Sequence, residues 1–223
     1  MLCSHRYIMA SSITKKAIMS VTGLFLILFL TLHVTANLTI LWGQEAYDAV
    51  TEFMGTNPVI QLVVPVLALG FVIHIGYSLI LNLKNLKARG PVGYAGGMKS
   101  RSAGFDRRAS QNMLVLGIIV LGFLVLHLSQ FWIKMQWQHL TGGDPENGYL
   151  LVTGYLGTPW VAICYIAWFA ALWFHISHGF WSAFQTLGLS NQRILPVLRI
   201  VSMIYSSLLF AGFTVIVIWC MFF

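Results

Sequence analysis

The chain has 223 residues, of which 58% are hydrophobic and only 9% are charged, and it carries a net charge of +7. This composition excludes an ordinary soluble globular domain and is typical of an integral membrane protein. The basic residues lie between the apolar stretches, so they bear on topology, lipid and partners at one membrane face and do not indicate nucleic-acid binding. The three cysteines form no CxxC pattern, which argues against a disulfide framework or a structural zinc site.

Five apolar stretches are long enough to cross a bilayer, which takes about 20 residues in a helix. They predict an all-α membrane protein, with residues 1–223 forming one domain that is a bundle of five transmembrane helices. The predicted spans are 17–41, 59–83, 111–137, 159–187 and 194–223. The first span is too long for a signal peptide and is expected to be retained. The first eight residues differ in pattern from the rest of the chain, and Met9 is a plausible alternative start.

The connectors differ in pattern and in charge. Apolar residues at helical spacing predict a short interfacial helix within residues 44–57. Pro65 is expected to kink the second span. Residues 84–108 are predicted to form a basic, glycine-rich loop, and residues 138–158 a polar loop.

Basic residues are confined almost entirely to one side of the predicted bundle. All but one of the 13 Lys and Arg residues lie before the first span, between the second and third spans, or around the start of the fifth. Five of the 6 acidic residues lie in the other connectors. By the positive-inside rule, the N-terminus is therefore predicted to be cytoplasmic and the C-terminus, after five crossings, to be outside.

Four spans each carry a histidine at membrane depth, where an ionisable side chain is costly and rarely without function. Successive spans run in opposite directions, so His33 and His127 fall in the outer half and His74 and His175 in the inner half. At a rise of about 1.5 Å per residue, the two levels are roughly 10 Å apart. A lone intramembrane histidine is more often structural than a ligand. Four that pair by depth favour two bis-imidazole sites, each suited to one haem b.

Small residues flank His175 on its own helix face, with Ala171 one turn before it and Gly179 one turn after it. Such a face leaves room for a flat cofactor whose metal is held by the imidazole. His178 competes with His175 as the ligand; we favour His175 and expect His178 to bind a haem propionate or a backbone carbonyl. Further candidates for propionate contacts on the inner side are Ser20 and Arg108.

The residues around these histidines resemble a known family. The matching stretches are Ser20-x-Thr22-Gly23-Leu24-Phe25, then Phe29-Leu30-x-x-His33-x-x-x-Asn37, and His175-x-x-x-Gly179. Together with one candidate histidine ligand on each of the first four spans and none on the fifth, they are similar to the cytochrome b membrane anchor of succinate dehydrogenase and fumarate reductase. The type that they resemble is the single chain with five helices and two haems. The resemblance covers nearly the whole chain from about residue 11.

The resemblance implies a three-subunit complex in a bacterial cytoplasmic membrane. A flavoprotein interconverts succinate and fumarate, an iron–sulfur subunit relays electrons, and both lie on the cytoplasmic face. The anchor exchanges electrons with a membrane quinone, for which menaquinone is expected. The chain carries no flavin or cluster motif, so it is not expected to act on succinate itself.

By position, His33 and His127 match the family's ligands of the haem far from the iron–sulfur subunit, and His74 and His175 match those of the near haem. The chain departs from some two-haem relatives at Trp173, where they have a glutamate implicated in moving protons across the membrane. No Asp or Glu lies inside any predicted span, so a proton wire of carboxylates is not expected.

A quinone site needs a proton donor or acceptor beside an apolar pocket near a haem. The candidates on the outer side are Glu52, Gln130, Trp132 and Lys134. Glu52 is expected to exchange the quinol proton, because it is an acid near the outer end of the second span. A pocket on the inner side, near Ser20 and Arg108, is the alternative.

Two other functions stay open. The first is the cytochrome b anchor of another quinone-linked oxidoreductase, of the hydrogenase or formate dehydrogenase type. The equal distribution of one candidate ligand on each of four spans argues against it. The second is a haem-free transporter or channel, which would be expected to have charged or discontinuous spans. The spans here are acid-free and, apart from Pro65, continuous.

Overall fold

The computed structural model describes residues 12–89, 112–143 and 146–223, and in these ranges the chain forms helices and no strands. Five of the described helices are long and apolar enough to cross a membrane. They are Ile13–Trp42, Pro58–Ala88, Met113–Trp137, Pro159–Thr186 and Ile194–Phe222. The predicted all-α bundle of five membrane spans is therefore confirmed. Arg108 and most of the predicted basic loop lie outside the described residues.

Each span corresponds to one long helix, in two cases extended by a helix of another type. The first is α2 (Ser12–Asn37) followed by the 3-10 helix η1 (Leu38–Trp42), and the second is α4 (Pro58–Arg89). The third is α6 (Met113–His127) followed by η2 (Leu128–Trp137), which is a π-helix. The fourth and fifth are α9 (Pro159–Thr186) and α10 (Ile194–Phe222). Three short helices connect them: α3 (Gln44–Thr56), α7 (Gln138–Thr141) and α8 (Gly148–Leu156).

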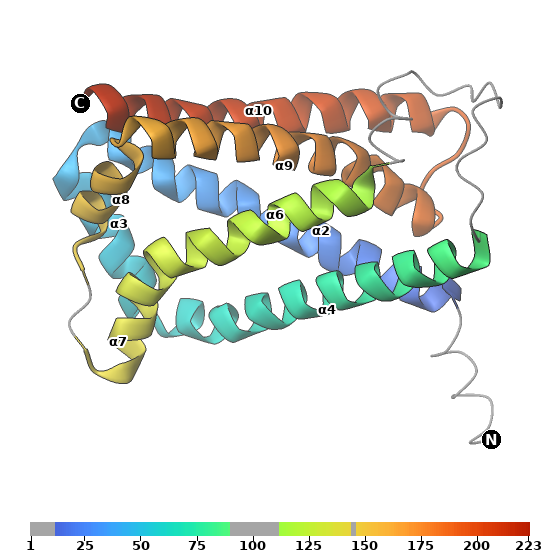
Figure 1. Ribbon diagram of the computed structural model, residues 1–223, viewed down its shortest axis with the longest axis horizontal. Helices are drawn as coiled ribbons and strands as arrows, with labels where there is room; N and C mark the ends of the chain where they lie inside the picture. The colour runs from blue at the N-terminus through green and yellow to red at the C-terminus, as the bar shows by residue number, and fades with distance from the viewer. Residues whose placement is uncertain (1–11, 90–111, 144–145) are drawn as a thin grey trace.

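The long helices run side by side along the longest axis of the molecule (Figure 1). α9 packs against α10, α2 and α6, whereas α4 packs mainly against α2 and has few contacts with α6. The short helices α3, α7 and α8 gather at the end where α10 finishes, and α2 begins at the opposite end. The spans that carry the four histidines are thus neighbours in the bundle. Contacts are few between α4 and α6.

The buried core lies where α9, α10 and α8 meet the end of α2. Its members include Val34, Ile40, Tyr165, Phe169 and Val217. Large apolar side chains on the outer faces, such as Leu28, Leu62 and Ile163, are more than half exposed. In a bilayer such faces contact lipid, whose tails are as apolar as the side chains themselves. The exposed apolar surface is therefore what a multi-pass membrane protein requires.

The interfacial helix predicted within residues 44–57 is confirmed as α3. The second span is longer than predicted, because α4 continues to Arg89 through residues assigned to the basic loop. Leu, Lys and Ala are good helix formers, so charge alone does not end a helix there. Pro65 lies inside α4, and its expected kink stays a prediction.

The prediction of a loop over residues 138–158 is wrong, because this stretch contains α7 and α8. Asn147 caps α8, since its side-chain oxygen accepts a hydrogen bond from the Leu150 amide at 2.9 Å. The helix then buries Leu151, Val152 and Leu156 against the core. A carboxylate on α3 fixes its position: Asp48 accepts hydrogen bonds from the Asn147 side chain at 2.8 Å and from the amide of residue 149 at 3.3 Å.

Candidate functional site

The first pair of histidines joins α2 to the end of α6. The ring centroids of His33 and His127 are 5.8 Å apart, and their planes are inclined at 86°. Aromatic side chains enclose the pair: Phe29 stacks on His33 at 5.3 Å, Phe131 lies 5.1 Å from His127, and Phe213 of α10 lies 6.1 Å from His33. The two imidazoles therefore face each other in an apolar setting.

The second pair joins α4 to α9. The ring centroids of His74 and His175 are 6.4 Å apart, with planes inclined at 76°. The Nδ1 atom of His74 lies 3.1 Å from the Met19 carbonyl oxygen and 3.5 Å from the Thr22 hydroxyl of α2. When Nδ1–H of a histidine donates to a backbone carbonyl, the tautomer and ring orientation are fixed and Nε2 is left to bind a metal.

Both pairs have the spacing of two axial ligands of one metal. A histidine nitrogen binds a transition metal at about 2 Å, which places the centroids of two opposed imidazoles roughly 6 Å apart. The observed separations of 5.8 and 6.4 Å agree with this value. The buried Nδ1 atoms of His127 and His175 have no hydrogen-bond partner among the described residues. Other buried polar atoms of the described residues share this feature, among them the indole nitrogen of Trp219, so it does not by itself indicate a bound group.

Each pair offers two imidazole donors to a bound group. Within the described ranges, no group of three or more His, Cys, Asp or Glu side chains could hold a metal. A bare zinc or copper site needs three or four protein ligands, whereas haem iron takes only one or two because the macrocycle provides the rest. The donor set of each pair therefore fits a haem.

Glycines adjoin both rings of the second pair. A Cβ on Gly23 of α2 would lie 3.1 Å from Cε1 of His74, and one on Gly117 of α6 would lie 3.8 Å from Cε1 of His175. The absence of a side chain at Gly23 thus allows α2 to approach the His74 ring closely. At Gly179, one turn beyond His175, a Cβ would meet no atom within 4 Å. Open space on the His175 face is what a flat cofactor needs.

The remaining candidates on the predicted inner side occupy different places. The ring that faces His74 is that of His175, whereas the ring of His178 packs against Trp181 at 4.8 Å. Arg199 of α10 lies over the same indole, 4.7 Å from its centroid. Ser20 is buried in the turn of α2 that also contacts His74. This arrangement supports His175 over His178 as the ligand, which stays a prediction.

Only two of the four residues predicted for the quinone site lie in a common cleft. Gln130 and Lys134 line a common cleft of about 580 Å³, and neither Glu52 nor Trp132 is part of its lining. Glu52 is exposed on α3. The cleft also contains Glu146, which is not among the candidates predicted from the sequence because it lies in a stretch predicted to be a loop.

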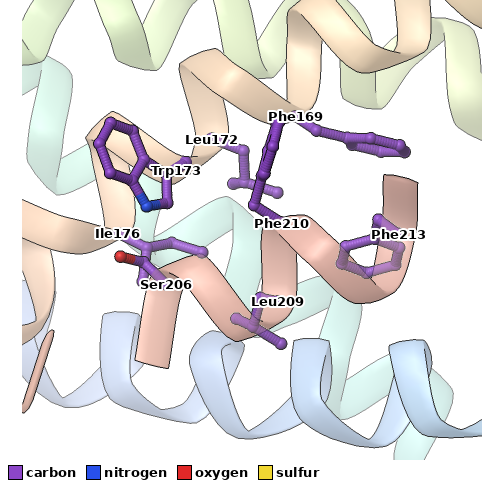
Figure 2. A pocket seen from close by; sticks show the side chains of 8 residues that line it. All are labelled: Phe169, Leu172, Trp173, Ile176, Ser206, Leu209, Phe210 and Phe213. Carbon is purple, nitrogen blue, oxygen red and sulfur yellow. The ribbon is translucent and has the colours of Figure 1, made fainter. Parts of the chain in front are cut away.

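Figure 2 shows a second cavity, of about 10 Å³, between α9 and α10. Phe169, Phe210 and other apolar side chains line it together with Ser206. It is large enough for at most one water molecule. Trp173 borders it and donates a hydrogen bond from its indole nitrogen to the Ser207 hydroxyl at 3.0 Å. Trp173, whose side chain does not titrate, thus links α9 to α10.

Comparisons with known protein families, with curated proteins and with solved structures found no match for this chain. Membership of a family is accordingly a proposal, which the sequence motifs and the two histidine pairs support.

Proposed function

We propose that this protein is a dihaem membrane cytochrome b, the anchor subunit of a succinate dehydrogenase or fumarate reductase. It transfers electrons between an iron–sulfur partner and a membrane quinone. The observation that carries this proposal is the pairing of four intramembrane histidines at ring separations of 5.8 and 6.4 Å. His33 and His127 would hold one haem, and His74 and His175 the other. A bound haem supplies one-electron chemistry at its iron.

The residues of the chain have defined tasks in this function. The two imidazoles of each pair would hold the iron of one haem between them, and an iron held by two protein ligands favours electron transfer over oxygen binding. The aromatic side chains around the first pair exclude water, and the Met19 carbonyl holds the His74 ring in orientation. His33 and His127 lie in the halves of their spans that are nearer to α3 and α8, whereas His74 and His175 lie about midway along α4 and α9. The two pairs therefore sit at successive depths across the membrane.

The charge distribution supports one end of the bundle as the place where the proposed partners dock. Exposed Lys84 and Lys87 lie at the end of α4 that is remote from α3 and α8. If this end is cytoplasmic, as the positive-inside rule predicts, the iron–sulfur subunit and the flavoprotein dock here. The other end then faces the outside of a bacterial cytoplasmic membrane and exchanges electrons with menaquinone.

The test is the haem content and the reduced-minus-oxidised absorption spectrum of the complex purified in mild detergent. We expect two haems b per chain. His33→Ala and His127→Ala should each remove one of them, and His74→Ala and His175→Ala should each remove the other. His178→Ala is the matched control and should keep both haems. A folded, intact complex without haem would contradict the proposal and favour a haem-free transporter.

A further inference from the structure

Two lysines meet where the start of α2 lies beside the end of α4, at the basic end of the bundle (Figure 1). The two helices are antiparallel neighbours, and Nδ1 of His74 on α4 lies 3.1 Å from the Met19 carbonyl oxygen on α2. Lys15 stands one turn before Met19, on the same helix face. Its ammonium group lies close enough to that of Lys84 on α4 for the two positive charges to repel each other directly.

No carboxylate offsets these charges within the described part of the chain. Neither α2 nor α4 contains an Asp or Glu residue, and Lys15 and Lys84 form no ion pair with any described side chain. Lys16 and Lys87, both exposed, add further positive charge to the same ends of the two helices. Adjacent like charges destabilise the fold that holds them. A bound anion between Lys15 and Lys84 would remove that repulsion.

Exposed apolar side chains flank the lysines on both helices. Ile13 of α2 is 78% exposed, and Leu83 and Leu86 of α4 are 64% and 42% exposed. Both helices are long enough to span the membrane, so these side chains lie near the ends of spans. A lysine in such a position extends its methylene stem along apolar surface and keeps its ammonium at the level of the lipid head groups. The surface therefore suits a ligand that combines an anionic group with an apolar body.

We propose that Lys15 and Lys84 bind the phosphate group of one anionic phospholipid between the start of α2 and the end of α4. Each ammonium donates hydrogen bonds to a phosphate oxygen, and the acyl chains lie along the exposed apolar side chains of the two helices. Basic sites between membrane helices bind anionic lipid head groups in this way. The site requires no haem, so the inference is independent of the proposed function.

The apolar neighbours favour a phospholipid over the acidic surface of another protein. An acidic protein surface would neutralise Lys15 and Lys84 but would place polar groups against Leu83 and Ile13, which are largely exposed. A phospholipid satisfies both kinds of side chain, because its phosphate adjoins its acyl chains. Free inorganic phosphate would neutralise the lysines and leave the apolar side chains without a partner.

The experiment is native mass spectrometry of the full-length protein, purified with its bound subunits, freed of lipid and titrated with dioleoylphosphatidylglycerol. Lys15→Gln and Lys84→Gln should each weaken binding of the first lipid molecule about fivefold, as expected for one lysine at an anionic lipid. Lys84→Arg keeps the charge and should bind as the native protein does. The matched control is Arg193→Gln, which removes one exposed positive charge just before α10 and should leave the affinity unchanged.

An equal loss of affinity in all three Gln variants would assign lipid binding to general surface charge and overturn the inference. Equal affinity of the native protein for phosphatidylcholine would overturn it too, as would displacement of the lipid by millimolar inorganic phosphate. If the Gln variants lose their bound subunits and keep their lipid affinity, the lysines form a protein-docking surface instead. Thermal unfolding of each variant shows that it is folded, and weakened binding in a folded Lys84→Arg variant would contradict the charge-based site.

Discussion

Tyr47 shows how one side chain outside the spans supports the first histidine pair. It is buried on α3, and its hydroxyl donates a hydrogen bond to the Asn37 side-chain oxygen at 3.0 Å. Asn37 in turn donates to the backbone carbonyl of His33 at 2.8 Å. Burial, with a smaller contribution from neighbouring Cys220 and Asp48, raises the pKa of Tyr47, so the hydroxyl keeps its proton. The turn of α2 that carries His33 is thereby tied to α3.

Replacing Tyr47 with Phe should lower the free energy of unfolding by about 1 kcal/mol, because the half-buried Asn37 oxygen loses its donor. The pH dependence should change too. The folded-state pKa is above the unfolded value of about 10, so this stabilisation is complete below about pH 10 and falls as the pH rises further. Tyr47→Phe should remove that part of the alkaline decline. Thermal unfolding in detergent between pH 7 and 11 measures both effects.

Tyr149→Phe is the control for this prediction, because the Tyr149 ring packs against that of Tyr47 at 6.3 Å and the substitution changes only a hydroxyl. An equal loss of stability in both variants would mean that the Tyr47–Asn37 hydrogen bond has no special role. An unchanged alkaline decline in Tyr47→Phe would assign that decline to another group.

Helices that follow from a long apolar run could be predicted from the sequence. Helices that depend on tertiary contacts could not. A run of about 20 apolar residues has few alternatives to a membrane-spanning helix, so all five spans were predictable. By contrast, α8 depends on the Asn147 cap and on burial of Leu151 and Leu156, which a local polar pattern conceals. The π-helix η2 leaves no recognisable mark in the sequence.

The candidate site divides in the same way. The two histidine pairs could be predicted because the alternating direction of the spans fixes the depth of each imidazole, and the structure brings the two rings of each pair within 6.4 Å of each other. The cleft could not be predicted, because it combines Lys134 of η2 with Glu146, twelve residues later, across a turn whose path the sequence does not reveal.

Gly179 offers a test of whether α9 leaves space for a cofactor. A Cβ at this position would meet no atom of the protein within 4 Å. Gly179→Ala should therefore stabilise the haem-free chain slightly, since alanine is favoured over glycine inside a helix by about 1 kcal/mol. The holoprotein should behave differently, because the added methyl group occupies the space on the His175 face. We expect loss of the haem held by His74 and His175, measured by absorption, with the other haem kept.

Gly76→Ala is the matched control. A Cβ there also meets no atom within 4 Å, but Gly76 comes two residues after His74 and so points to another side of α4. This variant should keep both haems. Retention of both haems in Gly179→Ala would show that no flat group lies against this part of α9.

At the scale of the whole molecule, the charges and the candidate sites are segregated along the bundle. Lys15, Lys84 and Lys87 lie at the end where α2 begins, whereas the ion pair of Lys134 and Glu146 lies at the end where α10 finishes (Figure 1). The first histidine pair adjoins the cleft, and the second lies deeper in the bundle. In the proposed function, electrons that enter at the basic end would therefore meet His74 and His175 before His33 and His127.

The order of the two histidine pairs across the membrane depends on the orientation of the protein. Variants with a single cysteine can determine that orientation. In a background without the native cysteines, Glu45→Cys on α3 and Lys87→Cys on α4 place one exposed thiol at each end of the bundle. A membrane-impermeant maleimide added to intact cells should label Glu45→Cys alone, and both variants after the membrane is opened. Labelling of Lys87→Cys alone in intact cells would show that the protein has the opposite orientation in the membrane. The cleft lined by Lys134 and Glu146 would then face the cytoplasm. In the proposed function, an iron–sulfur partner there would lie nearest to His33 and His127, which would reverse the order of the two pairs.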